Sequence, residues 1–216
     1  MTATLIGATG LIGNELLQEL LADNYFATIR LLVRKPLKKM DVRIETKLID
    51  FNDPESFKLG IEGSDAFFVA VGTTQSKVKG DKAAYRKVDY DIPVRAAQFC
   101  KETGCENFIL VSSAGADANS NNFYLKLKGE VEEAVKKMQV KSVHIMRPSI
   151  LLGNRKEFRL GEKIGKAVMK TFSFLVPAKY KPIFANDVAR AMLCAAKKNE
   201  AGFWIYEYGE IKRLIR

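Results

Sequence analysis

The chain has 216 residues, 47% of them hydrophobic, which suits one compact domain with a core that needs neither disulfides nor metal ions. Its 35 basic residues exceed its 25 acidic ones and give a formal net charge of +10, which favours anionic ligands. Three cysteines without C-x-x-C spacing, and no apolar run of membrane-spanning length, argue against a disulfide scaffold, a zinc site and a transmembrane helix.

A glycine-rich turn lies near the N-terminus, between an apolar strand expected over residues 3–6 and a helix with leucines at helical spacing. Gly7 allows the tight turn, Gly10 lets backbone N–H groups approach a pyrophosphate, and Gly13 lets the helix lie close to the sheet. The helix N-terminus adds a partial positive charge. The spacing differs from Gly-x-Gly-x-x-Gly, but the strand–helix context predicts a nucleotide-phosphate site, with an ordinary glycine-rich turn as the alternative.

A basic pair follows the second expected strand, residues 28–33. Arg34 stands where an enzyme that uses NAD usually carries Asp or Glu. A carboxylate there bonds the free ribose 2′-hydroxyl, whereas a guanidinium binds a 2′-phosphate through two parallel hydrogen bonds. The sequence therefore predicts NADP(H), with Arg34 at its 2′-phosphate. A solvated basic loop that continues through Lys38 and Lys39 is the alternative.

Strand and helix patterns then alternate, as a doubly wound, mostly parallel α/β sheet requires. Asp50 follows the third expected strand, residues 43–48, and is expected on the adenine side of the nucleotide. Gly72 and Thr73 follow a buried fourth strand over residues 65–71. Because such folds bind cofactors at the carboxyl ends of their strands, we expect these residues to line the cofactor crevice.

A long helical region over residues 83–103 follows, with an interruption or a restart expected near Pro93 and an end at Gly104. The fifth and sixth strands are expected over residues 107–111 and 141–146.

Candidate catalytic residues follow the fifth strand. Ser112 and Ser113 come directly after it, and Tyr124 and Lys128 stand four residues apart on the next expected helix. At that spacing the ammonium lies beside the phenol and favours its ionised form, which suits a tyrosine that exchanges protons near neutral pH. Tyr-x-x-x-Lys alone occurs by chance in many basic helices, so the preceding serines are needed for the prediction.

The last part of the chain predicts a helix over residues 162–172, an apolar loop over 174–177 and a helix over 187–197 with Asn186 or Asp187 as its N-cap. Alternating aromatic residues around Trp204 indicate a late strand. Side chains that could line a pocket, with core packing as the alternative, are Phe172, Phe174, Leu175 and Tyr180.

Two residue types are assigned no functional role. His144, the single histidine, lies on an expected strand without an apparent acidic partner, so we interpret it as structural. The cysteines, Cys100, Cys105 and Cys194, are odd in number and indicate a reducing compartment, and no metal cluster is expected. Because the first strand begins too near Met1 for a signal peptide, we expect a cytoplasmic location.

These motifs together resemble the short-chain dehydrogenase/reductase superfamily, in particular its atypical branch similar to the HIV Tat-interactive protein 2 (Tat-interacting oxidoreductase) family and its bacterial relatives. The combination of Ser-Ser-Ala-Gly-Ala-Asp with a following Tyr-x-x-x-Lys-Gly-Glu-x-Glu is more specific than any single motif. The segments that carry the resemblance are residues 7–13, 71–74, 88–89, 111–117, 123–132 and 147–153.

The resemblance implies a single NAD(P)-binding Rossmann domain over residues 1–216, in which residues 154–216 form a small substrate-side region. It implies Ser112 as the substrate-orienting serine with Ser113 as fallback, Tyr124 as general acid/base, and Lys128 as the lysine that binds the ribose and tunes the tyrosine. The cofactor-binding residues that it implies are Gly7, Thr9, Gly10, Leu11, Ile12, Arg34, Asp50, Gly72, Thr73, Tyr124, Lys128, Pro148 and Ile150, the last two near the nicotinamide.

We therefore predict an NADP(H)-dependent oxidoreductase that transfers hydride to or from a small carbonyl or alcohol substrate. Because the chain after Gly153 is short, we expect no larger lobe of the kind with which sugar-nucleotide enzymes of the superfamily enclose their substrates, and therefore a small substrate. An NADPH-binding regulatory or protein-interaction module is the alternative, because the animal relatives are named for protein binding. The scattered basic residues match no nucleic-acid motif, so no specific nucleic acid is expected, although a cluster at Lys212, Arg213 and Arg216 leaves polyanion binding as a third hypothesis.

Overall fold

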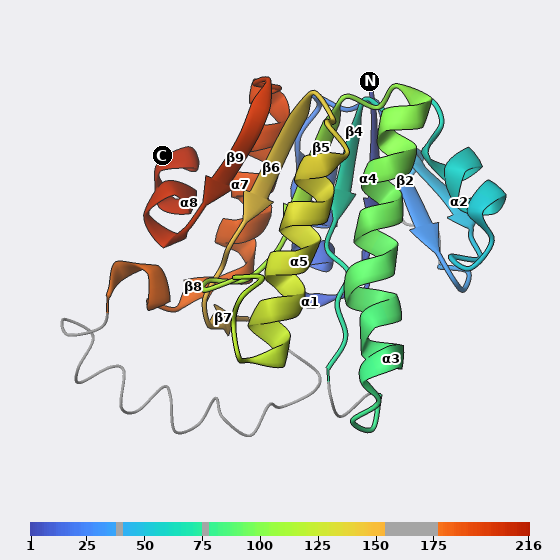
Figure 1. Cartoon of the computed structure of the whole chain (residues 1–216). Helices are drawn as coiled ribbons and strands as arrows, with labels where there is room; N and C mark the ends of the chain where they lie inside the picture. The colour runs from blue at the N-terminus through green and yellow to red at the C-terminus, as the bar shows by residue number, and fades with distance from the viewer. Residues whose placement is uncertain (38–40, 75–77, 154–176) are drawn as a thin grey trace.

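The structure is a computed structural model that describes residues 1–37, 41–74, 78–153 and 177–216 (Figure 1). In these residues seven strands form one sheet in the order β3-β2-β1-β4-β5-β6-β9, and every neighbouring pair is parallel. The strands are β1 (Thr2–Ile6), β2 (Thr28–Val33), β3 (Ile44–Leu48), β4 (Ala66–Val69), β5 (Asn107–Val111), β6 (Ser142–Met146) and β9 (Gly202–Tyr206). The predicted Rossmann-type fold is confirmed.

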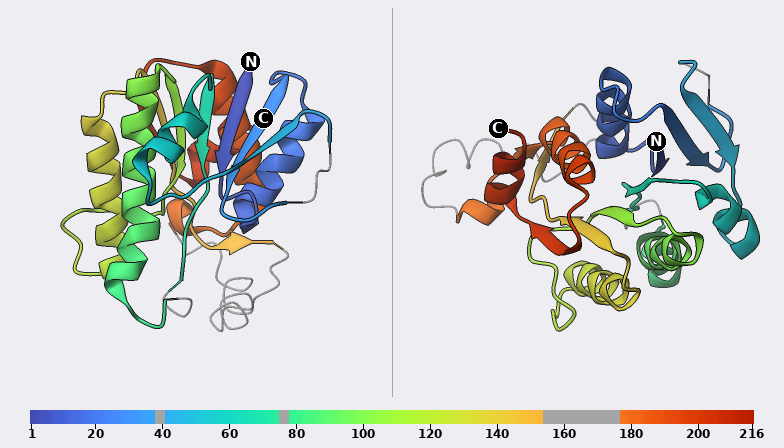
Figure 2. Two further views of the ribbon diagram at one scale, coloured as in Figure 1. Left: turned by 90° about the vertical axis from the view of Figure 1, so that its right-hand side faces the viewer. Right: turned by 90° about the horizontal axis from the view of Figure 1, so that it is seen from above.

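Helices cover both faces of the sheet (Figure 2). On one face lie α1 (Leu11–Ala22) and α7 (Ala185–Lys198), and on the other α2 (Pro54–Ile61), α4 (Ile92–Thr103) and α5 (Phe123–Lys137). The shorter elements are α3 (Lys82–Arg86), the π-helix η1 (Lys87–Asp91), β7 (Leu151–Leu152), the 3-10 helix η2 (Ala178–Tyr180), β8 (Ile183–Phe184) and α8 (Tyr208–Leu214).

Two apolar cores separate the sheet from its helices. Leu16 and Leu20 of α1 pack with Val188 and Met192 of α7 on one face, and Phe57, Ala96 and Val131 from the other three helices pack on the opposite face. The central strands are apolar on both sides because both faces are covered, as parallel sheets require. The strand order reverses between β1 and β4, which is where such folds form their ligand crevice.

The helical region before β5 runs through α3, η1 and α4 without leaving the helical conformation. Pro93 is the second residue of α4 and comes just after the π turn, so the irregularity predicted near Pro93 is this wider turn and not a break in the helix. Gly104 ends α4 in the left-handed conformation with φ of 74°, as predicted.

The expected N-cap of α7 is wrong. The helix begins at Ala185 with Phe184 in the cap position. The Asn186 amide instead donates to Glu19 on α1 at 2.7 Å, and the Asp187 carboxylate pairs with Lys212 on α8 at 2.7 Å. Both side chains are therefore used between helices, a tertiary role that local capping preference does not reveal.

The C-terminal segment divides between two places. Strand β9 and helix α7 belong to the main layers, whereas β7, β8 and η2 lie at the carboxyl edge of the sheet, at the bottom of Figure 1. The expected helix over residues 162–172, most of the apolar loop, Lys38 and Lys39 lie outside the described residues, as do the pocket candidates Phe172, Phe174 and Leu175.

Candidate functional site

The glycine-rich turn joins β1 to α1 at the switch in strand order. Gly7 has φ of 90°, and a Cβ atom there would lie 2.5 Å from the carbonyl oxygen of Ala70. A Cβ atom on Gly13 would lie 2.0 Å from the carbonyl oxygen of Gly7, so the helix sits directly on the turn. The amide of Gly10 donates to the carbonyl of Gly7 at 2.9 Å, which closes the turn. Gly10 and Thr9 are exposed, so the backbone there is open to a ligand.

The next two turn residues differ in their surroundings. Ile12 is 6% exposed and belongs to the core, so its side chain is used in packing and not in the expected nucleotide contact. The Leu11 side chain lies against Gly153, where a Cβ atom would come within 2.9 Å of it. Gly153, directly after β7, thus lies against the first residue of α1.

Arg34 and Asp50 lie at the same edge of the sheet. Arg34 follows β2, and Asp50 follows Ile49, whose amide donates to the carbonyl of Val33 at 2.9 Å. Both side chains are exposed, and the Asp50 carboxylate accepts hydrogen bonds from the backbone and side chain of Asn52 at 2.8 and 2.9 Å. The parallel strands therefore place the two predicted adenosine-side residues on neighbouring strand ends.

Gly72 and Thr73 lie in the loop after β4. The Thr73 amide donates to the carboxylate of Asp89 at 2.7 Å, and a Cβ atom on Gly72 would lie 3.4 Å from the same carboxylate. Tyr85 adds a hydrogen bond from its hydroxyl to the Thr73 carbonyl at 3.3 Å. The loop is thus held against helix α3 and η1 by two side chains.

Tyr124 lies in the first turn of α5, at the carboxyl edge of the sheet. The Asn122 side chain caps the helix by accepting hydrogen bonds from the amides of Tyr124 and Leu125 at 3.0 and 3.2 Å. A Cβ atom on Gly129 would lie 2.1 Å from the amide nitrogen of Ala118, so α5 packs tightly on the loop that follows β5. These contacts fix the helix start and leave the Tyr124 side chain 36% exposed.

Lys128 lies one helical turn further, with its side chain 7% exposed. Its ammonium lies 5.9 Å from the centre of the Tyr124 ring and 3.0 Å from the Asp89 carboxylate. Burial disfavours the charged ammonium, but the charges of Asp89 and Tyr124 favour it, and the balance raises the pKa of Lys128. The lysine therefore carries a positive charge beside the tyrosine.

Ser112 is buried, and its hydroxyl already has a partner. It is 5% exposed, and its hydroxyl donates to the buried carboxylate of Glu132 on α5. Arg147 after β6 holds the same carboxylate through hydrogen bonds of 2.5, 3.0 and 3.2 Å. Ser113, the next residue, is half-buried. The serine expected to orient the substrate is thus committed to an internal network, and the fallback serine is the more accessible of the two.

The loop after β6 is tied to the loop after β5. The carbonyl of Pro148 accepts from the amide of Ala114 at 2.9 Å, and the Ser149 hydroxyl donates to the carbonyl of Lys181 beside η2. The Ile150 side chain is 46% exposed, and that of Tyr180 is 42% exposed. A Cβ atom on Gly115 would lie 3.8 Å from the Tyr180 hydroxyl. Tyr180 therefore borders the site and is not core.

Some acidic and basic residues of the site escaped the sequence analysis. Asp89, Glu132 and Arg147 all lie in segments that carry the family resemblance, but the sequence predicted no role for any of them. Charged residues within apolar strand and helix patterns are the signal that could have found them, because a buried charge requires a partner. Within the described residues, no group of three or more His, Cys, Asp or Glu side chains is arranged to hold a metal ion.

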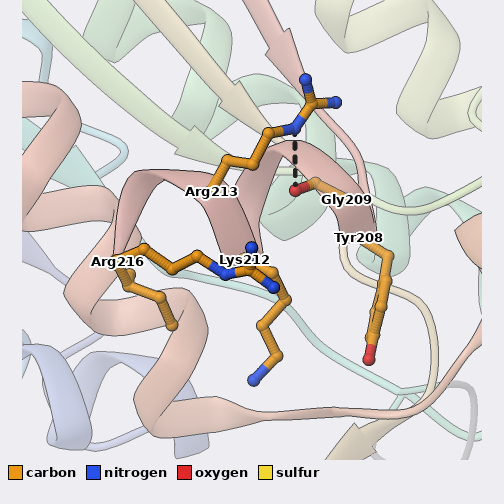
Figure 3. Close-up of a pocket in the computed structure, with 6 residues that line it drawn as sticks. Tyr208, Gly209, Lys212, Arg213 and Arg216 are labelled. Atoms are coloured by element: carbon orange, nitrogen blue, oxygen red, sulfur yellow. Dashed lines mark hydrogen bonds between the residues drawn. The ribbon is translucent and has the colours of Figure 1, made fainter.

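A basic cavity on α8 contains none of the predicted cofactor-binding or catalytic residues, but it is lined by the basic cluster of Lys212, Arg213 and Arg216 (Figure 3). Within it, Lys212 pairs with Asp187 and Arg213 with Glu210, each at 2.7 Å, and Arg213 also donates to the carbonyl of Gly209 at 3.4 Å. The positive charge of this cluster is therefore partly neutralised by its own neighbours. The lining residues are Tyr208, Gly209, Lys212, Arg213, Ile215 and Arg216.

Comparison with known sequences gives consistent matches over most of the chain. A family model described as NAD(P)H-binding matches residues 7–198. The chain is 33% identical to protein HTATIP2 of Rattus norvegicus over 165 residues, which covers 75% of this chain and 67% of that protein. It is 31% identical to the mitochondrial protein FMP52 of Eremothecium gossypii over 225 residues, which covers 100% of this chain and 98% of that protein. The FMP52 name contradicts the expected cytoplasmic location, because these relatives are called mitochondrial.

Solved structures with the same fold include a complex with a nucleotide sugar and NAD, and an oxidoreductase. MoeE5 in complex with UDP-glucose and NAD has a TM-score of 0.72 at 16% identity, covering 98% of this chain and 79% of that chain. The oxidoreductase ylbE from Lactococcus lactis has a TM-score of 0.67 at 20% identity, covering 100% and 95%. At these identities the likeness shows the fold alone. Along the described part of the chain, no helix has both the length and the apolar composition needed to cross a membrane.

Proposed function

This chain belongs to the NAD(P)H-binding family, and from that we propose that it is an NADP(H)-dependent oxidoreductase acting on a small carbonyl or alcohol. The observation that carries the proposal is the buried Lys128 ammonium beside Tyr124, at the same sheet edge as the phosphate turn. A buried cation next to a partly exposed phenol is the arrangement that a tyrosine acid/base needs.

The residues around the crevice fit a dinucleotide with an extra phosphate. The exposed turn at Thr9 and Gly10 leads directly into the N-terminus of α1, which has no side-chain cap and whose first-turn N–H groups suit a pyrophosphate. A side chain at Gly7 or Gly13 would collide with the backbone, so the turn keeps this tight form only with glycine at both positions. Arg34 is exposed at the end of β2, where its guanidinium would bind a 2′-phosphate. When bound, the cofactor supplies the hydride.

In the proposed reaction Tyr124 gives its phenolic proton to the carbonyl oxygen during reduction and takes it back during oxidation. Lys128 keeps a positive charge beside the phenol and hydrogen-bonds the ribose. We assign the hydrogen bond that orients the substrate oxygen to Ser113, since the Ser112 hydroxyl is already bound to Glu132. Ile150 and Tyr180, both exposed near this edge, supply apolar surface to a small substrate.

The first test is a fluorescence titration of the purified protein with NADPH and NADH, followed by a screen of small carbonyl compounds. We expect NADPH to bind more tightly, and at least one carbonyl to consume it. Absence of binding by either nucleotide would refute the proposal and favour a module that acts through a protein partner.

A second prediction concerns the acid/base. Tyr124→Phe removes the phenolic proton and should lower kcat by about 100-fold or more, with little change in the NADPH dissociation constant. Ser113→Ala should also lower kcat, whereas Ser112→Ala should mainly reduce stability. Full activity of Tyr124→Phe on a substrate turned over by the wild type would show that another group provides the proton.

A further inference from the structure

Asp89 is a buried carboxylate to which the proposed function assigns no role. Its side chain is 2% exposed, between the loop after β4 and helix α5. One oxygen lies 3.0 Å from the Lys128 ammonium, and the other accepts a hydrogen bond from the Thr73 amide at 2.7 Å. One carboxylate therefore contacts both the loop expected at the nucleotide and the lysine expected at the acid/base.

The helix that carries Asp89 has an irregular form at this residue. Asp89 lies at the centre of η1, a single π-type segment between α3 and α4. Such wide turns change the direction of the side chains that they carry and are frequent at functional sites. Here the turn aims a charged side chain at α5 and the loop after β4, although its neighbours in the helix are mostly apolar or exposed.

The charges around the pair come from several elements. On α5 itself, Tyr124 and Glu132 face Lys128, and Glu132 is in turn held by Arg147 from the loop after β6. Arg86 of α3 pairs with Glu130 of α5 at 2.7 Å, in a more exposed position. Asp89 is thus the carboxylate in direct contact with the Lys128 ammonium.

We propose that Asp89 is a positioning residue that holds the Lys128 ammonium and the Thr73 amide together, so that nucleotide binding and proton transfer at Tyr124 depend on one carboxylate. This inference rests on the roles proposed above for Lys128 and Tyr124. Without the carboxylate, the ammonium would be buried without its ionic partner and would lose its proton more readily. The loop after β4 would at the same time lose an anchor of charge-assisted strength.

The test uses Asp89→Asn, which keeps the shape and an oxygen acceptor for the Thr73 amide but removes the charge. We expect Lys128 to titrate at least about one pH unit lower than in the wild type, because its main favourable charge is gone. NMR of protein labelled with ¹³C-lysine follows this titration, and the Lys128→Arg variant assigns the resonance. We also expect NADPH to bind about tenfold more weakly and the pH profile of kcat to move.

The matched control is Glu130→Gln. It removes the ion pair between α3 and α5, which lies in a more exposed position and includes neither Lys128 nor Thr73. The control should leave the Lys128 titration, the NADPH affinity and the pH profile unchanged. A carboxylate that only stabilised the fold would lower the melting temperature without moving the Lys128 titration, and that result would overturn the inference.

A double variant covers the case in which Asp89→Asn does not fold. Asp89→Asn with Lys128→Met removes both charges, so recovery of folding would support the pairing and continued failure to fold would contradict it. The two proposals can also fail separately. If the wild type binds NADPH but Asp89→Asn does not change the titration of Lys128, only this inference is refuted. If the wild type binds no nucleotide, the proposed function is refuted, and a shifted Lys128 titration in Asp89→Asn still supports the contact between Asp89 and Lys128.

Discussion

Ser112 and Ser113 are adjacent in the chain but have different surroundings. Successive side chains at the end of a strand point to opposite sides, so only one of the two can face the crevice. The buried Glu132 and its partner Arg147 take the Ser112 hydroxyl, which leaves Ser113 half-buried at the loop. At the scale of single residues, the hydrogen-bond partners of a side chain decide its possible role as much as the residue type does.

Arg34 carries a prediction of the same scale. Arg34→Glu replaces a guanidinium that suits a 2′-phosphate by a carboxylate that repels it and accepts from a free 2′-hydroxyl. The ratio of NADPH to NADH affinity should therefore reverse, as nucleotide fluorescence titrations would show. Lys35→Glu, one residue further in the same exposed turn, is the control and should change the ratio less. An unchanged ratio in Arg34→Glu would rule out the contact.

At the scale of elements, strands β6 and β9 are joined by a buried polar cluster. His144 of β6 is fully buried, and its two ring nitrogens lie 2.9 Å from the Ser142 hydroxyl and 3.0 Å from the Tyr206 hydroxyl of β9. Burial, with a smaller effect of Lys198, lowers the pKa of His144 to about 4. Burial also raises the pKa of Tyr206 to about 12, so both groups are neutral at pH 7.

This cluster predicts a pH dependence of stability. In the unfolded chain a histidine takes up a proton near pH 6.5, whereas His144 in the folded protein does so only near pH 4. The unfolded state thus binds more protons between these values, and the free energy of unfolding should fall as the pH drops from about 6.5 to 4, by up to about 3 kcal/mol. Urea unfolding across this range measures it. In His144→Gln the free energy of unfolding should depend less on pH over this range. An equally steep dependence would mean that carboxylates, and not His144, cause the loss of stability.

At the scale of the whole molecule, the positive charge is not gathered in the crevice where we propose that the nucleotide binds. Several basic residues are paired locally with carboxylates, including Lys197 with Asp23 and Lys212 with Asp187. The crevice, in contrast, lies between two halves of the sheet, one carrying the phosphate turn and Arg34 and the other Tyr124 and Lys128. A ligand that spans the crevice contacts both halves.

This arrangement predicts how ligands stabilise the protein. NADPH at 100 times its dissociation constant should raise the free energy of unfolding by about 2.7 kcal/mol, because it binds the folded state alone. Adenosine 2′,5′-bisphosphate, which contacts only the half with Arg34, should at equal concentration raise the melting temperature less. Thermal unfolding followed by circular dichroism compares the two. Equal shifts would mean that the half with Lys128 contributes nothing to binding.

The sequence by itself determined the fold class and most strand positions, because period-two and apolar patterns with glycine punctuation are local signals. The strand over 107–111 and the end of α4 at Gly104 were predicted to the residue. The tight turn between β1 and α1 was predictable for the same reason, since its glycines act within one turn. Motif spacing placed Tyr124 and Lys128 on one helix, which the structure bears out.

Only the tertiary structure decided which polar groups are already engaged. The Ser112 hydroxyl binds Glu132, twenty residues away, and Asp89 forms an ion pair with Lys128 on another helix. Asp187, one of the two expected N-cap residues, forms an ion pair with Lys212 instead. Each of these contacts joins elements distant in the chain, and a buried charge or hydroxyl takes the nearest partner that packing supplies. No local pattern encodes that choice, because it depends on how the sheet brings the elements together.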